Sequence, residues 1–206
     1  KIGTYEDLLA IRTAITKLYT DNGYVTSGAF LPPQDISDGI ISIQVVEGEL
    51  ERVEIEGLER LRENYIRSRI GLAADPPIDL SRLEKALQLL QLDPLLETVI
   101  AELSAGSAPG LSILTLNIKE APAFHLSFIG ENRQSPSIGS LGGKIAASHD
   151  NLAGFGDRLY GEFEITEGLN HFETGYSFPV NARNGTINIS YQKSDSKIIE
   201  DPFSEL

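Results

Sequence analysis

The sequence predicts an α+β N-terminal part, built from small sheets covered by helices, followed by an antiparallel all-β part. Apolar residues recur at helical spacing only before Pro122. After Pro122, about five segments of roughly 9 to 10 residues alternate between apolar or aromatic and polar side chains. This length and period are typical of strands that cross a membrane in a β-barrel, and also of a soluble sheet packed on one side.

The first element expected is a helix over residues 5 to 21, because Leu8, Ile11 and Ile15 stand at helical spacing. Thr4 followed by Asp7 has the spacing of a capping pair, and Asn22-Gly23 ends the helix.

A hairpin follows, with one extended run from Tyr24 to Phe30 and a second from Ile40 to Glu47. In the second run Ile41, Ile43 and Val45 alternate with polar residues, as in a half-buried strand. Pro32-Pro33-Gln34 is placed in the connection, because proline cannot donate to a strand ladder. Gly48 closes the hairpin, and its first run is expected to be the edge strand.

A second unit starts directly after Gly48. We expect a strand at 52–56, a helix at 64–70, a long helix within PIDLSRLEKALQLLQLDP, and strands at 96–103 and 111–119. Asp79 caps the long helix, or Ser81 does so in a capping box with Glu84. Because helix, strand, strand occurs in both units, the order indicates an internal repeat with domains at 1–49 and 50–121.

The all-β region, residues 122–206, carries apolar faces such as Leu159, Gly161, Phe163 and Ile165 against charged ones. A membrane barrel and a soluble one-sided sheet both fit this pattern. No segment that could form a second packing layer is visible in this region, which favours the barrel.

The composition of the chain argues against some classes of function. The 206-residue chain has a formal net charge of −13 and contains no cysteine and no methionine. A strongly acidic chain repels phosphate backbones, which argues against nucleic-acid binding. Absent cysteine excludes disulfides and thiolate chemistry and fits a compartment such as the bacterial periplasm. Since Lys1 lies inside what reads as structure, we expect the chain to be part of a longer protein.

No catalytic, cofactor or metal motif is expected. His125, His149 and His171 are scattered and lack metal-ligand spacing to a second histidine or cysteine. Asp150, Asn151 and Asp157 lack the ligand rhythm of a calcium loop and are interpreted as turn residues. The sequence therefore predicts a protein that is not an enzyme.

Two longer stretches carry a family resemblance. GYVTSGAFLPPQDISDGIISIQVVEGELERVEIEG (23–57) resembles the junction of two POTRA domains in two-partner-secretion transporters of the haemolysin secretion/activation type, within the Omp85 superfamily. PIDLSRLEKALQLLQLDP (77–94) resembles the second helix of the following POTRA domain, and DNLAGFGD (150–157) is similar to an early turn of that family's barrel.

The resemblance implies the C-terminal part of one POTRA domain at 1–49, a complete one at 50–121, and the first strands of an outer-membrane barrel at 122–206. It implies periplasmic POTRA domains in a Gram-negative-type bacterium, an unfolded secreted exoprotein as partner, and outer-membrane lipid around the barrel strands. Two alternatives stay open: a barrel-assembly insertase of the same superfamily, and a soluble periplasmic interaction module.

The resemblance also suggests two sets of site residues. It implies that an unfolded client would add as an extra strand at the edges of the POTRA sheets. The residues expected there are Tyr24, Thr26, Ala29, Thr98, Val99, Ile100, Ala101 and Glu102. The resemblance also implies that charged side chains of the barrel strands would line a water-filled pore. The residues expected there are Glu131, Lys144, Arg158, Glu162, Glu164 and Glu173.

Overall fold

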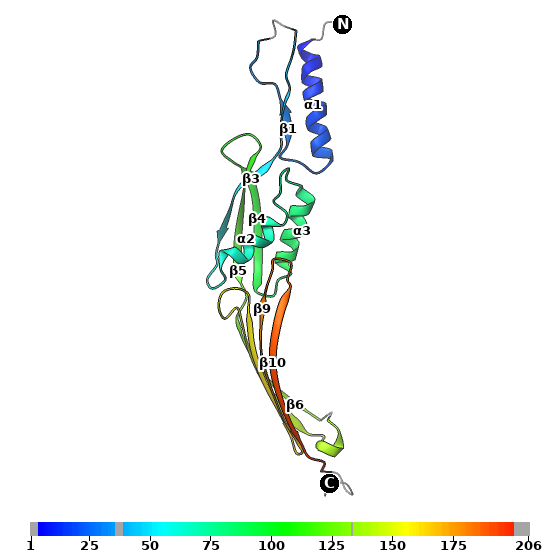
Figure 1. The fold of residues 1–206 in the computed structure, drawn as a ribbon, viewed down its shortest axis with the longest axis vertical. Coiled ribbons are helices and arrows are strands. Elements are labelled where there is room, and N and C mark those ends of the chain that lie inside the picture. The colour runs from blue at the N-terminus through cyan, green and yellow to red at the C-terminus, as the bar shows by residue number, and fades with distance from the viewer. Residues whose placement is uncertain (1–3, 36–38, 133, 200–206) are drawn as a thin grey trace. The chain divides into compact units, whose positions relative to one another are not determined.

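Helix α1, Tyr5–Asp21, opens the chain in a computed structural model that describes residues 4–35, 39–132 and 134–199 (Figure 1). The predicted capping box is confirmed: the Asp7 N–H donates to Thr4 Oγ1 at 3.3 Å and the Thr4 N–H donates to Asp7 Oδ2 at 2.8 Å. The helix ends at Asp21, with Asn22 as its C-cap and Gly23 following at φ +91°. Among the described residues, no helix is both long and apolar enough to cross a membrane.

The hairpin after α1 is shorter than predicted. Strands β1, Gly28–Phe30, and β2, Gln44–Val46, pair antiparallel. The expected strands Tyr24–Phe30 and Ile40–Glu47 were therefore too long. Tyr24 packs edge-on against Tyr19, and the N–H of Ser27 donates to the Tyr24 carbonyl, so this segment is a turn.

The side chain of Gln34 explains the Pro-Pro-Gln connection. Its amide oxygen accepts from the N–H of Ser42 at 2.7 Å, and its amide nitrogen donates to the Ser42 carbonyl at 2.8 Å. The side-chain amide thus pairs with the backbone as a neighbouring peptide group would. It replaces ladder bonds that the adjacent prolines cannot make.

Backbone bonds join the hairpin to the next sheet with no intervening linker. The N–H of Glu49 donates to the Gly110 carbonyl at 2.9 Å, and the N–H of Ile78 donates to the Gly48 carbonyl at 2.8 Å. Gly48 has no room for a side chain, because an added Cβ would overlap Thr26.

The next sheet has the strand order β3-β5-β4. Strand β3, Glu49–Glu56, runs parallel to β5, Leu111–Glu120, and β4, Leu96–Ala105, runs antiparallel to β5. A parallel pair needs a crossover, here supplied by helices α2, Glu63–Gly71, and α3, Leu80–Gln91 (Figure 1). Their core-facing side chains and those of the sheet form the core: Ile66, Ile70, Leu83, Leu90, Val99, Leu114, Leu116 and Ile118.

Asp79, and not Ser81, caps α3. Its carboxylate accepts from the backbone N–H groups of Ser81 and Arg82, and from the Ser81 hydroxyl at 2.7 Å. The Ser81 hydroxyl and these N–H groups hold the pKa of Asp79 below its usual value.

Five antiparallel strands follow, in the order β10-β9-β8-β7-β6. They are β6 Phe124–Glu131, β7 Gly142–Asp150, β8 Arg158–Thr166, β9 Leu169–Pro179 and β10 Thr186–Ser196. The chain divides into two compact units, Lys1–Leu58 with Ile66–Glu120, and Glu59–Tyr65 with Ala121–Leu206.

A matched pair of leucines on α3 tests which face packs on the sheet. Leu83 is 1% exposed and Leu89 is 65% exposed. Leu83→Ala should lower the free energy of unfolding by about 2–5 kcal/mol, since it removes buried methyl groups and leaves a cavity. Leu89→Ala should change it little. Chemical denaturation followed by helical circular dichroism measures both, and equal losses would contradict this packing.

Candidate functional site

Strand β4 leaves one row of peptide groups without a partner strand. It is an edge strand of its sheet, and on its other side it pairs only with β5. The N–H of Gly106 donates to the Leu111 carbonyl at 2.8 Å, which fixes that pair as a hydrogen-bonded one. Because bonded and non-bonded pairs alternate in an antiparallel ladder, the peptide groups of Val99, Ala101 and Leu103 point to the open edge.

The side chain of Gln91 reaches this open edge. Gln91 Nε2, at the end of α3, donates to the Val99 carbonyl at 3.3 Å. That bond is independent support for the outward direction of the Val99 peptide groups. The predicted residues Thr98 to Glu102 all lie on β4, and the Ile100 side chain is 61% exposed on the face away from the helices.

The first hairpin does not provide the open edge strand that the sequence predicts. Ala29 lies on β1, but its N–H donates to Thr16 Oγ1 of α1 at 3.0 Å. Tyr24 and Thr26 lie in the turn before β1 and not on an edge strand. Of the two predicted edges, β4 is therefore the longer and more open one.

The register of the five-stranded sheet gathers most of the predicted pore residues on one face. Lys144 stands opposite Glu164, and Glu162 stands opposite Glu173. Lys144 Nζ lies 2.7 Å from Glu162 Oε1. Glu131 joins them through Gln134, whose amide nitrogen donates to Glu131 Oε1 at 3.2 Å and to Glu164 Oε1 at 2.5 Å. We call Glu131, Lys144, Glu162, Glu164 and Glu173 the polar cluster.

Arg158 lies on the same face but outside the polar cluster. It begins β8, and its Nε lies 3.1 Å from Asp150 Oδ1. His125 Nε2 lies 3.3 Å from the other oxygen of the same carboxylate. The structure therefore places Arg158 at the strand ends and the polar cluster further along the strands.

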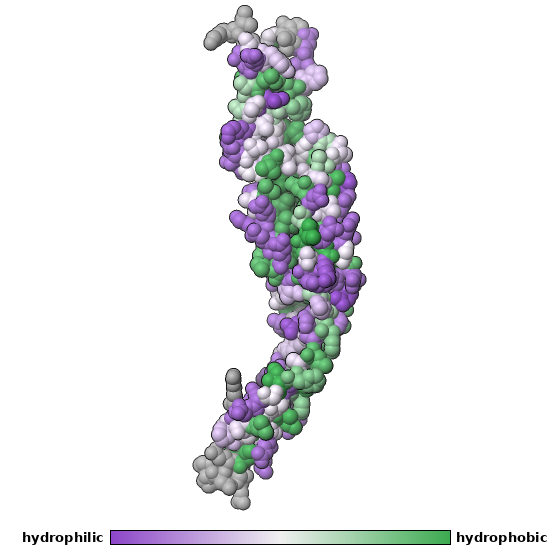
Figure 2. All heavy atoms as spheres, turned by 180° about the vertical axis from the view of Figure 1, so that it is seen from behind, coloured by the Kyte–Doolittle hydropathy of each residue, from purple (hydrophilic) through white to green (hydrophobic). Residues whose placement is uncertain are grey.

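Aromatic and aliphatic side chains occupy the opposite face, which no second layer covers in the described part of the chain. The most exposed of them range from 40% for Phe163 to 74% for Phe128, whereas Tyr176 and Phe178 on the same face are half-buried. Figure 2 shows hydrophobic atoms gathered over the strands in its lower half. A soluble one-sided sheet would cover such a face. The charged exceptions on it, Lys193 and Asp195, stand 3.2 Å apart near the end of β10.

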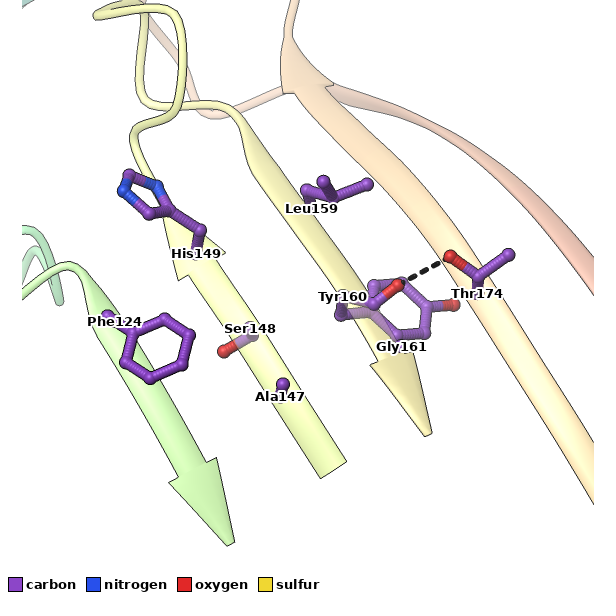
Figure 3. Close-up of a pocket in the computed structure, with 8 residues that line it drawn as sticks. All are labelled: Phe124, Ala147, Ser148, His149, Leu159, Tyr160, Gly161 and Thr174. Atoms are coloured by element: carbon purple, nitrogen blue, oxygen red, sulfur yellow. Dashed lines mark hydrogen bonds between the residues drawn. The ribbon is translucent and has the colours of Figure 1, made fainter. Parts of the chain in front are cut away.

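Small residues leave a shallow hollow of about 300 Å³ in this apolar face (Figure 3). Ala147, Gly161 and Thr174 stand side by side on β7, β8 and β9, with Phe124 and Leu159 at the rim. The Thr174 hydroxyl donates to the Tyr160 carbonyl at 2.8 Å. Its polar group is thereby satisfied within the protein, as an apolar solvent requires.

The turn between β7 and β8 is held by a buried carboxylate. Asp157 accepts from the N–H of Ala153 at 2.9 Å and from the Tyr176 hydroxyl at 2.8 Å. Burial raises the pKa of Asp157, but these bonds and further backbone N–H groups lower it by more, so it stays below its usual value. Asn151, at φ +65°, accepts from the N–H of Gly156 at 3.0 Å. The turn interpretation is confirmed for Asn151 and Asp157, whereas Asp150 is the last residue of β7 and pairs with Arg158.

Residues 59–65 belong to the same unit as this turn and contact it. The N–H of Arg62 donates to the Gly154 carbonyl at 2.9 Å, and its guanidinium lies 3.8 Å from the centre of the Phe155 ring. Gly154 has φ +88°, and an added Cβ would stand 2.9 Å from the Arg60 carbonyl oxygen. No sequence pattern indicates this contact, because its two segments lie far apart in the chain.

Known proteins with similar sequences include outer membrane transporters, and part of the chain matches a POTRA domain family. The family described as "POTRA domain, ShlB-type" matches residues 3–48. The chain is 30% identical over 196 residues to the outer membrane transporter CdiB of Dickeya dadantii, covering 89% of this chain and 32% of that protein. It is 25% identical over 155 residues to the heme/hemopexin transporter protein HuxB of Haemophilus influenzae, covering 74% and 27%. The chain thus spans about a third of these relatives.

Solved structures confirm the predicted fold class. CdiB from Escherichia coli matches with a TM-score of 0.66 and 26% identity, over 97% of this chain and 38% of that chain. BamA from Haemophilus ducreyi, lacking POTRA domains 1–3, matches with a TM-score of 0.63 over 94% and 37%, and its 16% identity shows the fold alone.

The relatives named CdiB are outer membrane transporters, which confirms the predicted localisation. The predicted resemblance to the POTRA-containing outer-membrane transporters of the Omp85 superfamily is therefore confirmed, with a ShlB-type POTRA match over residues 3–48.

Proposed function

We propose that this chain receives an unfolded secreted exoprotein in the periplasm and contributes the first wall strands of the outer-membrane pore through which that partner passes. The observation that carries the proposal is the opposite polarity of the two faces of the β6–β10 sheet. The apolar face contacts lipid, and the polar cluster contacts water in the pore. No catalytic step is needed for this role.

The domain division follows the same proposal. Residues 1–49 and 50–121 form the POTRA part, and residues 122–206 begin the barrel. The insertase alternative has less support, since the BamA likeness extends to fold alone while the ShlB-type match and CdiB share sequence.

Client binding is proposed at the open edge of β4. An extended polypeptide that pairs with the peptide groups of Val99, Ala101 and Leu103 gains main-chain hydrogen bonds that do not depend on its sequence. The exposed Ile100 side chain lies on the face away from the helices, so it is not needed for the ladder. Ala101 faces the helical layer with a side chain too small to obstruct a neighbouring strand.

Proline at adjacent positions of β4 separates client binding from folding. Ala101→Pro removes an N–H that faces the open edge, so it should weaken binding by about tenfold, the effect of losing a hydrogen bond of about 1.4 kcal/mol. Ile100→Pro removes an N–H that pairs with Asn117 of β5, so it should destabilise the sheet.

Fluorescence anisotropy with synthetic peptides that tile the N-terminal region of the secreted partner measures the binding, with Ala101→Ser as the control that keeps the N–H. If the Ala101→Pro protein is folded and binds these peptides as tightly as the control, client addition at β4 is wrong.

The proposed pore wall carries more negative than positive charge. The polar cluster sets four carboxylates against the single ammonium of Lys144. A pore lined this way should favour cations, because fixed charge concentrates counter-ions in a narrow channel.

Replacing both Glu162 and Glu164 by glutamine should lower the cation preference, seen as a smaller reversal potential under a salt gradient across a planar bilayer. The conservative change Phe163→Leu, on the opposite face, is the matched control. An unchanged reversal potential in the double glutamine variant would show that these carboxylates do not line the pore.

A further inference from the structure

The hairpin of β8 and β9 brings three metal-ligating side chains together on the polar face. Glu162 stands directly opposite Glu173, and His171 lies two positions away on the same strand and face as Glu173. One ligand atom from each of the three residues lies within 4.8 Å of the others. The side chain of Glu162 is 24% exposed, that of Glu173 is 28% exposed and that of His171 is 22% exposed. All three are therefore partly shielded from solvent but reachable by a small ion.

Electrostatics favour a cation between these side chains. Like charges directly opposite each other on neighbouring strands are destabilising, and Glu162 and Glu173 are such a pair. Lys144 now neutralises Glu162, but the register sets Lys144 directly opposite Glu164. A cation bound between Glu162 and Glu173 would neutralise both of these carboxylates. Lys144 could then turn to Glu164, so that each of the three carboxylates has a cationic partner.

We propose that Glu162, His171 and Glu173 bind one divalent transition-metal ion of the zinc type. Two carboxylate oxygens and one imidazole nitrogen are ligands that Zn²⁺ accepts, with water completing the coordination. An imidazole ligand suits zinc and its first-row neighbours, whereas Mg²⁺ and Ca²⁺ prefer oxygen alone.

The geometry needs only small side-chain movements. Ligand atoms about 2.0–2.2 Å from a tetrahedral zinc lie roughly 3.4 Å from one another. His171 Nε2 and Glu173 Oε2 are already 4.0 Å apart. The Tyr160 hydroxyl donates to the other oxygen of Glu173 at 2.8 Å, the kind of outer contact that orients a metal-bound carboxylate.

Sequence spacing does not show this set of residues. His171 and Glu173 are two residues apart, and Glu162 precedes them on another strand, so no motif links the three. Only the β8–β9 register places Glu162 beside the other two. The absence of a metal motif in the sequence is compatible with a site assembled across strands.

Zn²⁺ titration of the whole chain by calorimetry tests the proposal, with the visible absorption of Co²⁺ as a second readout. The chain should bind one equivalent, and Co²⁺ should show absorption bands typical of nitrogen and oxygen ligation. His171→Ala, Glu162→Gln and Glu173→Gln should each weaken Zn²⁺ binding by about tenfold or more.

His125→Ala is the matched control, because His125 lies on the same face beside Asp150 and away from the three ligands. Circular dichroism without metal establishes that each variant is folded. Absence of Zn²⁺ binding to the folded chain would overturn the proposal. Binding that survives His171→Ala, or that is lost equally in His125→Ala, would do so too.

Discussion

The cross-strand register of β6 to β10 decides which side chains share a face, and most of the other features depend on it. Because side chains alternate along a strand, a slip of one residue would move every aromatic group to the polar face. The observed register puts Ala147, Gly161 and Thr174 in one row and Lys144 opposite Glu164 in another. Lipid is the solvent in which a sheet with an uncovered apolar face and paired backbone groups is stable.

Local contacts hold that register in place. Asp157 fixes the β7–β8 turn through Ala153 and Tyr176, so it couples the turn to β9. On the polar face the ring of Tyr160 lies over Gly175, where an added Cβ would stand 2.6 Å from it. An aromatic ring over a cross-strand glycine supports pairing where glycine alone would weaken it. The same sheet thereby gains both a fixed register and a polar cluster.

Sequence pattern predicted those parts of the fold that local periodicity controls. The faces of α3 and of β8 to β10 follow the apolar spacing, and the Thr4–Asp7 capping box follows residue type. The pattern did not predict the lengths of β1 and β2, because the Tyr19–Tyr24 packing and the Gln34–Ser42 bonds are side-chain contacts that apolar alternation does not reveal. Which residues of β4 expose peptide groups depends on pairing with β5. The contacts of Gln134, and the meeting of Glu162 with His171, likewise need the folded register.

The central claim, that one face of this sheet contacts lipid and the other water, is tested most directly by spin labels on two adjacent alanines. Ala147 lies on the apolar face and Ala146, opposite Glu162, lies on the polar face. The chain has no cysteine, so Ala146→Cys and Ala147→Cys each carry a single nitroxide. In outer-membrane vesicles, relaxation by oxygen should dominate at 147, and relaxation by a water-soluble nickel complex should dominate at 146. Equal access of the nickel complex to both positions, or the reverse order, would contradict the assignment of the faces.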